Sequence, residues 1–175
     1  MLAPAVGVHH PELVSSATAD TEKDFPAVRR PGGVVAVAVN EVPAIADAEA
    51  SCSGKGTFTQ DATKSSDGDF SSITAATAQF DLQITGCPAT TTMTLFHIHN
   101  SSIGVNCPVV VDSGQKAIEP IALTNGATAG LITKTGITVT PETAKAIIHI
   151  APGFYFNVHS QLHGGGVIRG QLVQG

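Results

Sequence analysis

The chain has 175 residues, of which 42% are hydrophobic and 13% charged, so it can build one sizeable core and is not a disordered polyelectrolyte. Its formal net charge is −5 and its lysines and arginines form no stripe, which argues against a nucleic-acid-binding protein. No window approaches the roughly 18 consecutive apolar residues of a transmembrane helix, so no membrane span is expected.

Residues 1–32 combine prolines, charges and small residues without periodicity, and we interpret them as a flexible N-terminal arm. The first residues lack the basic region and the sustained apolar run of a signal peptide. The protein is therefore either cytosolic or a mature form whose signal has been removed. From residue 33 onward, short β-branched runs alternate with turn residues, and we assign 33–175 to one domain.

Several short segments of this domain have the composition of β-strands. The clearest is 77–85, where apolar and polar residues alternate as in a strand with one buried face. The expected strands and extended runs, in chain order, are 34–39, 54–62, 77–85, 92–100, 108–112, 118–123, 154–160 and 166–174, with a turn at 65–69.

One segment has helical signals instead. Thr140 can cap a helix, Pro141 suits its first position, and Pro152 with Gly153 ends the run, which predicts a short helix near 141–151. The fold class expected from all these elements is all-β: an antiparallel, Greek-key-like sandwich or barrel with one short helix.

Two histidines of the 92–100 strand are one residue apart. Because residues i and i+2 of a strand share a face, His97 and His99 project together, while Phe96 and Ile98 project into the core. Such a spacing allows two imidazoles to hold one metal ion.

A second group of histidines follows the same logic. His159 lies on the polar face of the strand 154–160 together with Asn157, and His163 lies in the turn just beyond. The other histidines are expected to be solvated: His9 and His10 in the arm, and His149 on the helix.

These observations support two interpretations. His97, His99, His159 and His163 can form an all-imidazole site, which suits Cu(II) or Zn(II) with copper bound more tightly. Asn157 and Arg169 are then the polar partners expected around the rings. Alternatively, the histidines bond loop carbonyls, and with Asn157 and Arg169 they form a purely structural polar network.

The chain has three cysteines and no CxxC motif of a zinc site. An odd number is compatible with one disulfide and one free thiol, or with three free thiols. We favour a disulfide between Cys87 and Cys107, because these two cysteines bracket the histidine-bearing strand, and we leave the pairing of Cys52 open.

Three segments together resemble the CHRD domain family, named after chordin. They are VAVNEVPAI (37–45), FHIHNSSIGVNCPVVVDSG (96–114) and APGFYFNVHSQLHGGGVIRGQL (151–172). The resemblance covers about residues 33–174. Two positions depart from the family pattern, because Cys107 stands where glycine is usual and Val167 where glutamate is usual.

This resemblance implies a β-sandwich module that is secreted, extracellular or periplasmic. The biochemical role of the family is poorly defined, so a non-catalytic module that binds an extracellular protein or polysaccharide is an alternative to a metal-binding one.

A fainter resemblance is to copper–zinc superoxide dismutases, which carry a histidine pair, a later single histidine and a Gly-rich, arginine-bearing segment in the same order. It implies a superoxide-dismutase-like fold, copper ligands at His97, His99 and His159, and a candidate fourth ligand at His163. No histidine cluster for zinc occurs between residues 100 and 148, and Arg169 falls inside the last strand. A copper-only dismutase is therefore a further alternative, and we favour a protein that is not an enzyme.

Overall fold

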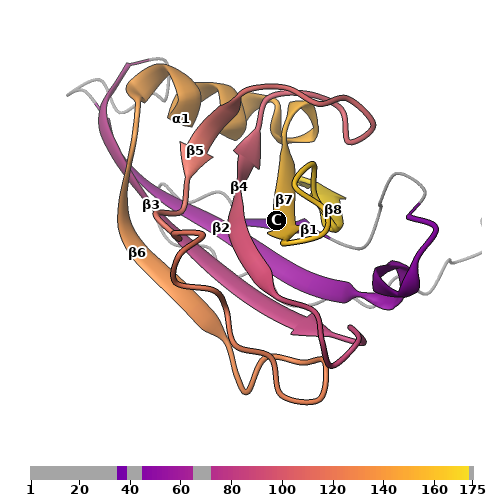
Figure 1. Ribbon diagram of the computed structural model, residues 1–175. Coiled ribbons are helices and arrows are strands. Elements are labelled where there is room, and N and C mark those ends of the chain that lie inside the picture. Colours follow the sequence, from indigo (N-terminus) through magenta and orange to yellow (C-terminus); the bar gives the residue numbers. More distant parts are fainter. Residues whose placement is uncertain (1–34, 39–44, 65–71, 174–175) are drawn as a thin grey trace, which may run out of the picture.

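A computed structural model of the chain describes residues 35–38, 45–64 and 72–173. The predicted arm and the predicted turn at 65–69 lie outside these residues. The described strands form two four-stranded sheets, which face each other as the two layers of a sandwich (Figure 1). Every strand pair is antiparallel, so the predicted all-β sandwich is confirmed.

The two sheets have different strand orders. Sheet A has the order β1-β2-β3-β6 and sheet B the order β5-β4-β7-β8. The strand β6 returns to β3 after β4 and β5 have entered the other sheet, so the chain crosses repeatedly between layers. The strands are β1 (Val35–Ala38), β2 (Ser53–Lys64), β3 (Ile73–Thr85), β4 (Met93–His99), β5 (Val109–Asp112), β6 (Ile132–Val139), β7 (Tyr155–Ser160) and β8 (Ile168–Gln171).

Aromatic rings from both sheets form the centre of the core. Phe80 of β3 makes edge-to-face contacts with Phe96 of β4 and Phe156 of β7, at centroid distances of 5.7 and 5.6 Å. A glycine allows this close approach of the layers, because a Cβ at Gly56 would meet the Phe156 ring at 3.0 Å. The predicted alternation of β3 is confirmed, since Phe80, Leu82 and Ile84 are buried.

The predicted helix is also present, as α1 (Pro141–His149) with the 3₁₀ turn η2 (Ala151–Gly153) behind it. The hydroxyl of Thr140 accepts a hydrogen bond from the Thr143 amide and caps the helix. The helix lies across one end of the sandwich (Figure 1) and buries Ala144, Ile147 and Ile148. Among the described residues, no helix has the length and hydropathy needed to cross a membrane.

Two elements differ from the prediction. The strand β6 was not predicted, because its sequence ITKTGITV has a glycine at its centre and its residues, except Val139, are exposed or partly exposed. Gly136 has φ +69° where the register with β3 shifts, so the glycine makes a β-bulge instead of ending the strand. The run 118–123 is no strand, and only Ile121 forms an isolated bridge, with Met93.

The predicted pairing of Cys87 with Cys107 is wrong. The disulfide joins Cys52 to Cys87, with a Cα–Cα distance of 4.1 Å, and Cys107 is free. Cys52 immediately precedes β2 and Cys87 closely follows β3, so antiparallel pairing of these strands brings both cysteines to the same end. Cys107 precedes β5 in the other sheet. Closeness in sequence was misleading here, because the chain changes sheets between β3 and β4.

Candidate metal centre

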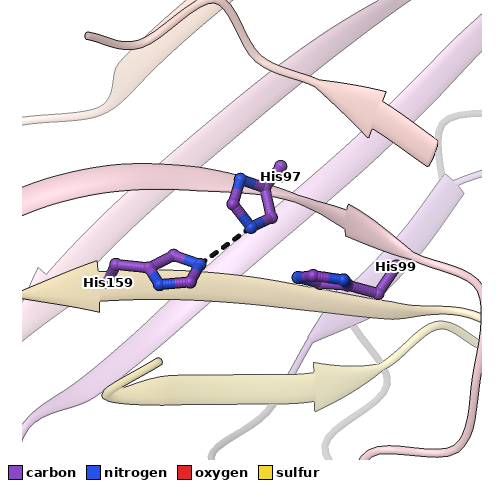
Figure 2. Close-up of side chains that lie close together, drawn as sticks. All are labelled: His97, His99 and His159. Atoms are coloured by element: carbon purple, nitrogen blue, oxygen red, sulfur yellow. Dashed lines mark hydrogen bonds between the residues drawn. The ribbon is translucent and has the colours of Figure 1, made fainter. Parts of the chain in front are cut away.

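The pairing of β4 with β7 brings the two predicted histidine groups together. His97 lies opposite Asn157, His99 opposite Tyr155, and Leu95 opposite His159. The rings of His97, His99 and His159 therefore gather on the side of sheet B that faces away from the core (Figure 2). One nitrogen from each ring can serve as a ligand atom, and these three atoms lie within 4.8 Å of one another. The group can hold a metal ion.

Backbone carbonyls fix the orientation of two of these rings. The Nδ1 atom of His159 lies 2.9 Å from the carbonyl oxygen of Gly164, and the Nδ1 atom of His99 makes a short contact with the carbonyl oxygen of Cys107. A carbonyl only accepts, so each Nδ1 carries the proton and each Nε2 presents a lone pair. Nε2 is one of the two ring nitrogens through which a neutral histidine binds a metal ion.

The third ring completes this arrangement. The Nε2 atom of His97 lies 2.8 Å from the Nε2 atom of His159. Since the latter is an acceptor, His97 donates this hydrogen bond through Nε2–H. For Nε2 of His97 to bind a metal ion, the ring would have to adopt its other tautomer, with the proton on Nδ1.

Asn157 lies among the rings. Its amide nitrogen is 3.0 Å from Nε2 of His159 and 3.3 Å from Nε2 of His99, and it also contacts the carbonyl oxygen of Gly165. Its amide oxygen accepts a hydrogen bond of 3.2 Å from Nε of Arg169. Because a guanidinium only donates, Arg169 fixes the amide with its NH₂ group toward the imidazoles.

Arg169 connects the site to the two loops that cover it, 100–108 between β4 and β5 and 161–167 between β7 and β8. Beyond Asn157, its guanidinium donates to the carbonyl oxygens of Ile103 and Gly165 and to the side-chain oxygen of Asn106. Arg169 is 3% exposed. All three of its donor nitrogens thus bond protein oxygens, and the guanidinium is not presented to a substrate.

Gly166 allows the second loop to lie directly on the site. It has φ +121°, and a Cβ at this position would meet the Asn157 side-chain oxygen at 2.0 Å. Any larger residue would push the loop away from Asn157.

These covering loops change the protonation of the rings. His97, His99 and His159 are each 7% exposed. Burial, with the neighbouring rings His159 and His99 as smaller causes, lowers the pKa of His97 to about 3. Burial also lowers the pKa of His99 and His159, with a smaller contribution from the charge of Arg169. All three rings are neutral near pH 7, which is the form that binds metals.

One residue of the site was not singled out from the sequence. Tyr155 stacks on His99, with ring centroids 4.8 Å apart, and the guanidinium carbon of Arg169 lies 5.2 Å from the centroid of the tyrosine ring. The Tyr155 hydroxyl donates a hydrogen bond to the carbonyl oxygen of Val105. The alternation of the strand placed Tyr155 on the face of His159. That signal could have identified it, but contact with His99 depends on the pairing of two strands.

His163 occupies a different environment from the other three histidines. Its Nε2 atom lies 2.9 Å from a carboxylate oxygen of Asp47 and 3.7 Å from one of Glu49. Both acidic residues belong to the segment around the 3₁₀ turn η1 (Ala48–Ser51), which leads into β2. The group of convergent ligand atoms contains His97, His99 and His159 but does not contain His163.

The other three histidines were predicted to be solvated, and the structure describes one of them. His149 is exposed on α1, whereas His9 and His10 lie outside the described residues. The described part of the chain thus contains one group of three or more convergent metal-ligating side chains, and it is the one built on β4 and β7.

Comparison with known proteins places this geometry in a family. No curated protein and no solved structure matches the chain. The family model of the CHRD domain matches residues 34–172, which include every strand of the described residues and all three convergent histidines. The chain belongs to the CHRD domain family.

Proposed function

We propose that this protein is an extracytoplasmic CHRD domain protein whose His97, His99 and His159 bind one transition-metal ion, with copper preferred to zinc. The observation that carries the proposal is that three neutral imidazoles converge. In two of them, His99 and His159, the proton is on Nδ1, so that Nε2 has a free lone pair. The affinity order of divalent ions for nitrogen ligands favours copper. His163 is not assigned as a ligand, because its ring is engaged by Asp47.

Separate observations support the proposed location. The disulfide between Cys52 and Cys87 is of the kind that persists in oxidising compartments. Membership of the CHRD domain family supports the same inference. We therefore expect the mature protein to work outside the cytoplasm.

A second candidate function is a non-catalytic interaction module with structural histidines, whose partner is an extracellular protein or polysaccharide. One observation favours it, because each ring already has a hydrogen-bond partner. His97 and His159 are bonded to each other, His159 also contacts Asn157, and His99 and His159 contact loop carbonyls. Buried polar groups with satisfied partners need no metal to be stable. Metal binding is the property that distinguishes the two functions.

The test is a calorimetric titration with Zn(II), with Cu(II), and with Cu(I) under anaerobic reducing conditions. We expect stoichiometric binding of copper by the wild type and its loss in His97→Ala/His159→Ala. The matched control is His149→Ala, which removes an exposed histidine from α1 and should bind as the wild type does.

Circular dichroism establishes whether the double variant is folded. If it is not, a rise in the melting temperature of the wild type on adding copper is the independent measurement. A folded wild type that binds none of the three ions would contradict the proposal and favour the interaction module. If copper binds, a superoxide assay on the loaded protein tests the dismutase alternative.

A further inference from the structure

The charge around the three imidazoles restricts which ion the centre can accept. The ligand atoms are all neutral nitrogens, and no carboxylate belongs to the group. The carboxylates of Asp47 and Glu49 pair with His163, which is not part of this group. Asp112 lies opposite His97 on the neighbouring strand, but it is exposed and its carboxylate accepts a hydrogen bond from the Gly114 amide. A bound ion would therefore keep nearly all of its positive charge.

Arg169 adds a further positive charge close by. It is buried, and the oxygens that accept its hydrogen bonds, on Asn157, Ile103, Asn106 and Gly165, are all formally neutral. Its Nε atom lies 3.2 Å from the Asn157 side-chain oxygen, and the nitrogen of the same amide lies 3.3 Å or less from Nε2 of His99 and of His159, so the positive charge is one side chain away from the rings. The repulsion between Arg169 and a metal ion doubles when the ion is divalent instead of monovalent.

The number of ligands available at the centre also favours a monovalent ion. The amide of Asn157 lies directly against the ligand atoms, because its nitrogen is within 3.3 Å of Nε2 of His99 and of His159, and an amide NH₂ group offers no lone pair to a metal ion. Arg169 holds the oxygen of that amide away from the rings. Zn(II) is usually bound by four ligands and Cu(II) prefers a tetragonal set. Cu(I) has a filled d shell as Zn(II) does, but its single charge needs less compensation and it also accepts three ligands.

We propose that the centre selects its ion by charge and binds monovalent Cu(I) in preference to divalent Cu(II) and Zn(II), with Asn157 and Arg169 as the residues that set this preference. The inference rests on the proposed function, since it specifies the oxidation state of the metal at the same site. Neither residue needs to be a ligand. Both act on the ion through their charge and orientation.

The test variant is Asn157→Asp, which replaces the amide by a carboxylate of the same shape, next to Arg169 and the rings. Competition with chelators of known affinity, under anaerobic conditions for Cu(I), gives the dissociation constants. We expect Zn(II) to bind at least about tenfold more tightly in the variant than in the wild type, and Cu(I) affinity to change by a clearly smaller factor. The midpoint potential of the bound Cu(II)/Cu(I) couple should fall, because the carboxylate stabilises the divalent state.

The matched control is Asn157→Leu, which has nearly the same size but neither an amide nor a charge, and which should not shift the preference toward divalent ions. If Asn157→Asp does not fold, Arg169→Gln removes the positive charge of Arg169 instead. Relative to the wild type, this variant should shift the preference from Cu(I) toward Zn(II). If Asn157→Asp changed the affinities for Zn(II) and Cu(I) by the same factor, or did not lower the Cu(II)/Cu(I) potential, the proposal that the centre selects its ion by charge would be overturned. A folded wild type that binds neither ion would instead overturn the proposed function itself.

Discussion

Both sheets carry polar residues on their outward faces, but these residues are exposed to solvent on sheet A and buried on sheet B. On β3 of sheet A, the outward residue Gln83 is exposed, and Gln79 and Asp81 are partly exposed. On β4 and β7 of sheet B, the outward residues His97, His99, Tyr155, Asn157 and His159 are all buried. Apolar and polar residues alternate in both cases. The difference is that loops 100–108 and 161–167 cover sheet B.

This comparison has a consequence for chemistry. The exposed polar residues of sheet A satisfy each other and the solvent, as when Thr133 donates a hydrogen bond of 2.6 Å to Asp81. Under the loops of sheet B, every polar group must find a protein partner, and the imidazoles are forced into their neutral form. Covering a polar face converts surface residues into a site with defined tautomers.

Acidification should affect sheet B most strongly. The pKa of His97 is about 3 in the folded state and 6.5 in its reference state. The unfolded chain therefore binds the proton first, and stability that is present above pH 6.5 should be lost as the pH falls toward 3. We expect a loss on the order of 3 kcal/mol from His97, after allowing for solvent screening. Urea unfolding of the metal-free protein between pH 8 and pH 4 measures it.

The control for this measurement is His149→Gln, which removes an exposed histidine of α1 that lies outside the three-ring group. In His97→Gln the acid loss should shrink. An identical pH dependence in the wild type and in His97→Gln would mean that His97 is not held neutral by burial.

Substitution of Gly166 should break the cover of sheet B. In Gly166→Ala the new Cβ would meet the Asn157 side-chain oxygen at 2.0 Å, in a backbone conformation with φ +121°. We expect a loss of about 2–3 kcal/mol in the free energy of unfolding. Thermal unfolding is the measurement. Gly165→Ala is the control in the same loop, since its Cβ would meet nothing within 4 Å. Equal losses in both variants would show that contact with Asn157 is not the cause.

The smallest effect comes from two outward glutamines, one on each sheet. The side-chain nitrogen of Gln171 donates to the carbonyl oxygen of Ser101, and its oxygen accepts from the Ile103 amide, which ties loop 100–108 to sheet B. Gln171→Ala should cost about 1–2 kcal/mol, because these partners are partly buried. Gln83→Ala on the exposed face of sheet A should cost less than about 0.5 kcal/mol. Denaturant unfolding of both variants compares them, and similar losses would contradict the difference between the faces.

Much of the fold could be predicted from the sequence, because alternation and capping are local signals. Phe80, Leu82 and Ile84 were placed in the core by their spacing alone, and Thr140 and Pro141 identified the start of α1. The prediction missed β6, where Gly136 accommodates a bulge that depends on the partner strand. It also paired Cys87 with the wrong cysteine, since disulfide partners depend on which strands are neighbours.

For the candidate site, the sequence by itself determined which histidines share a face of one strand. The common side of His97 and His99 follows from the backbone geometry of any β-strand, as does that of Asn157 and His159. Only the tertiary structure decided that β4 lies beside β7, that His163 turns toward Asp47, and that two loops bury the rings. The physical reason is that strand pairing and loop cover are set by contacts between residues far apart in the chain.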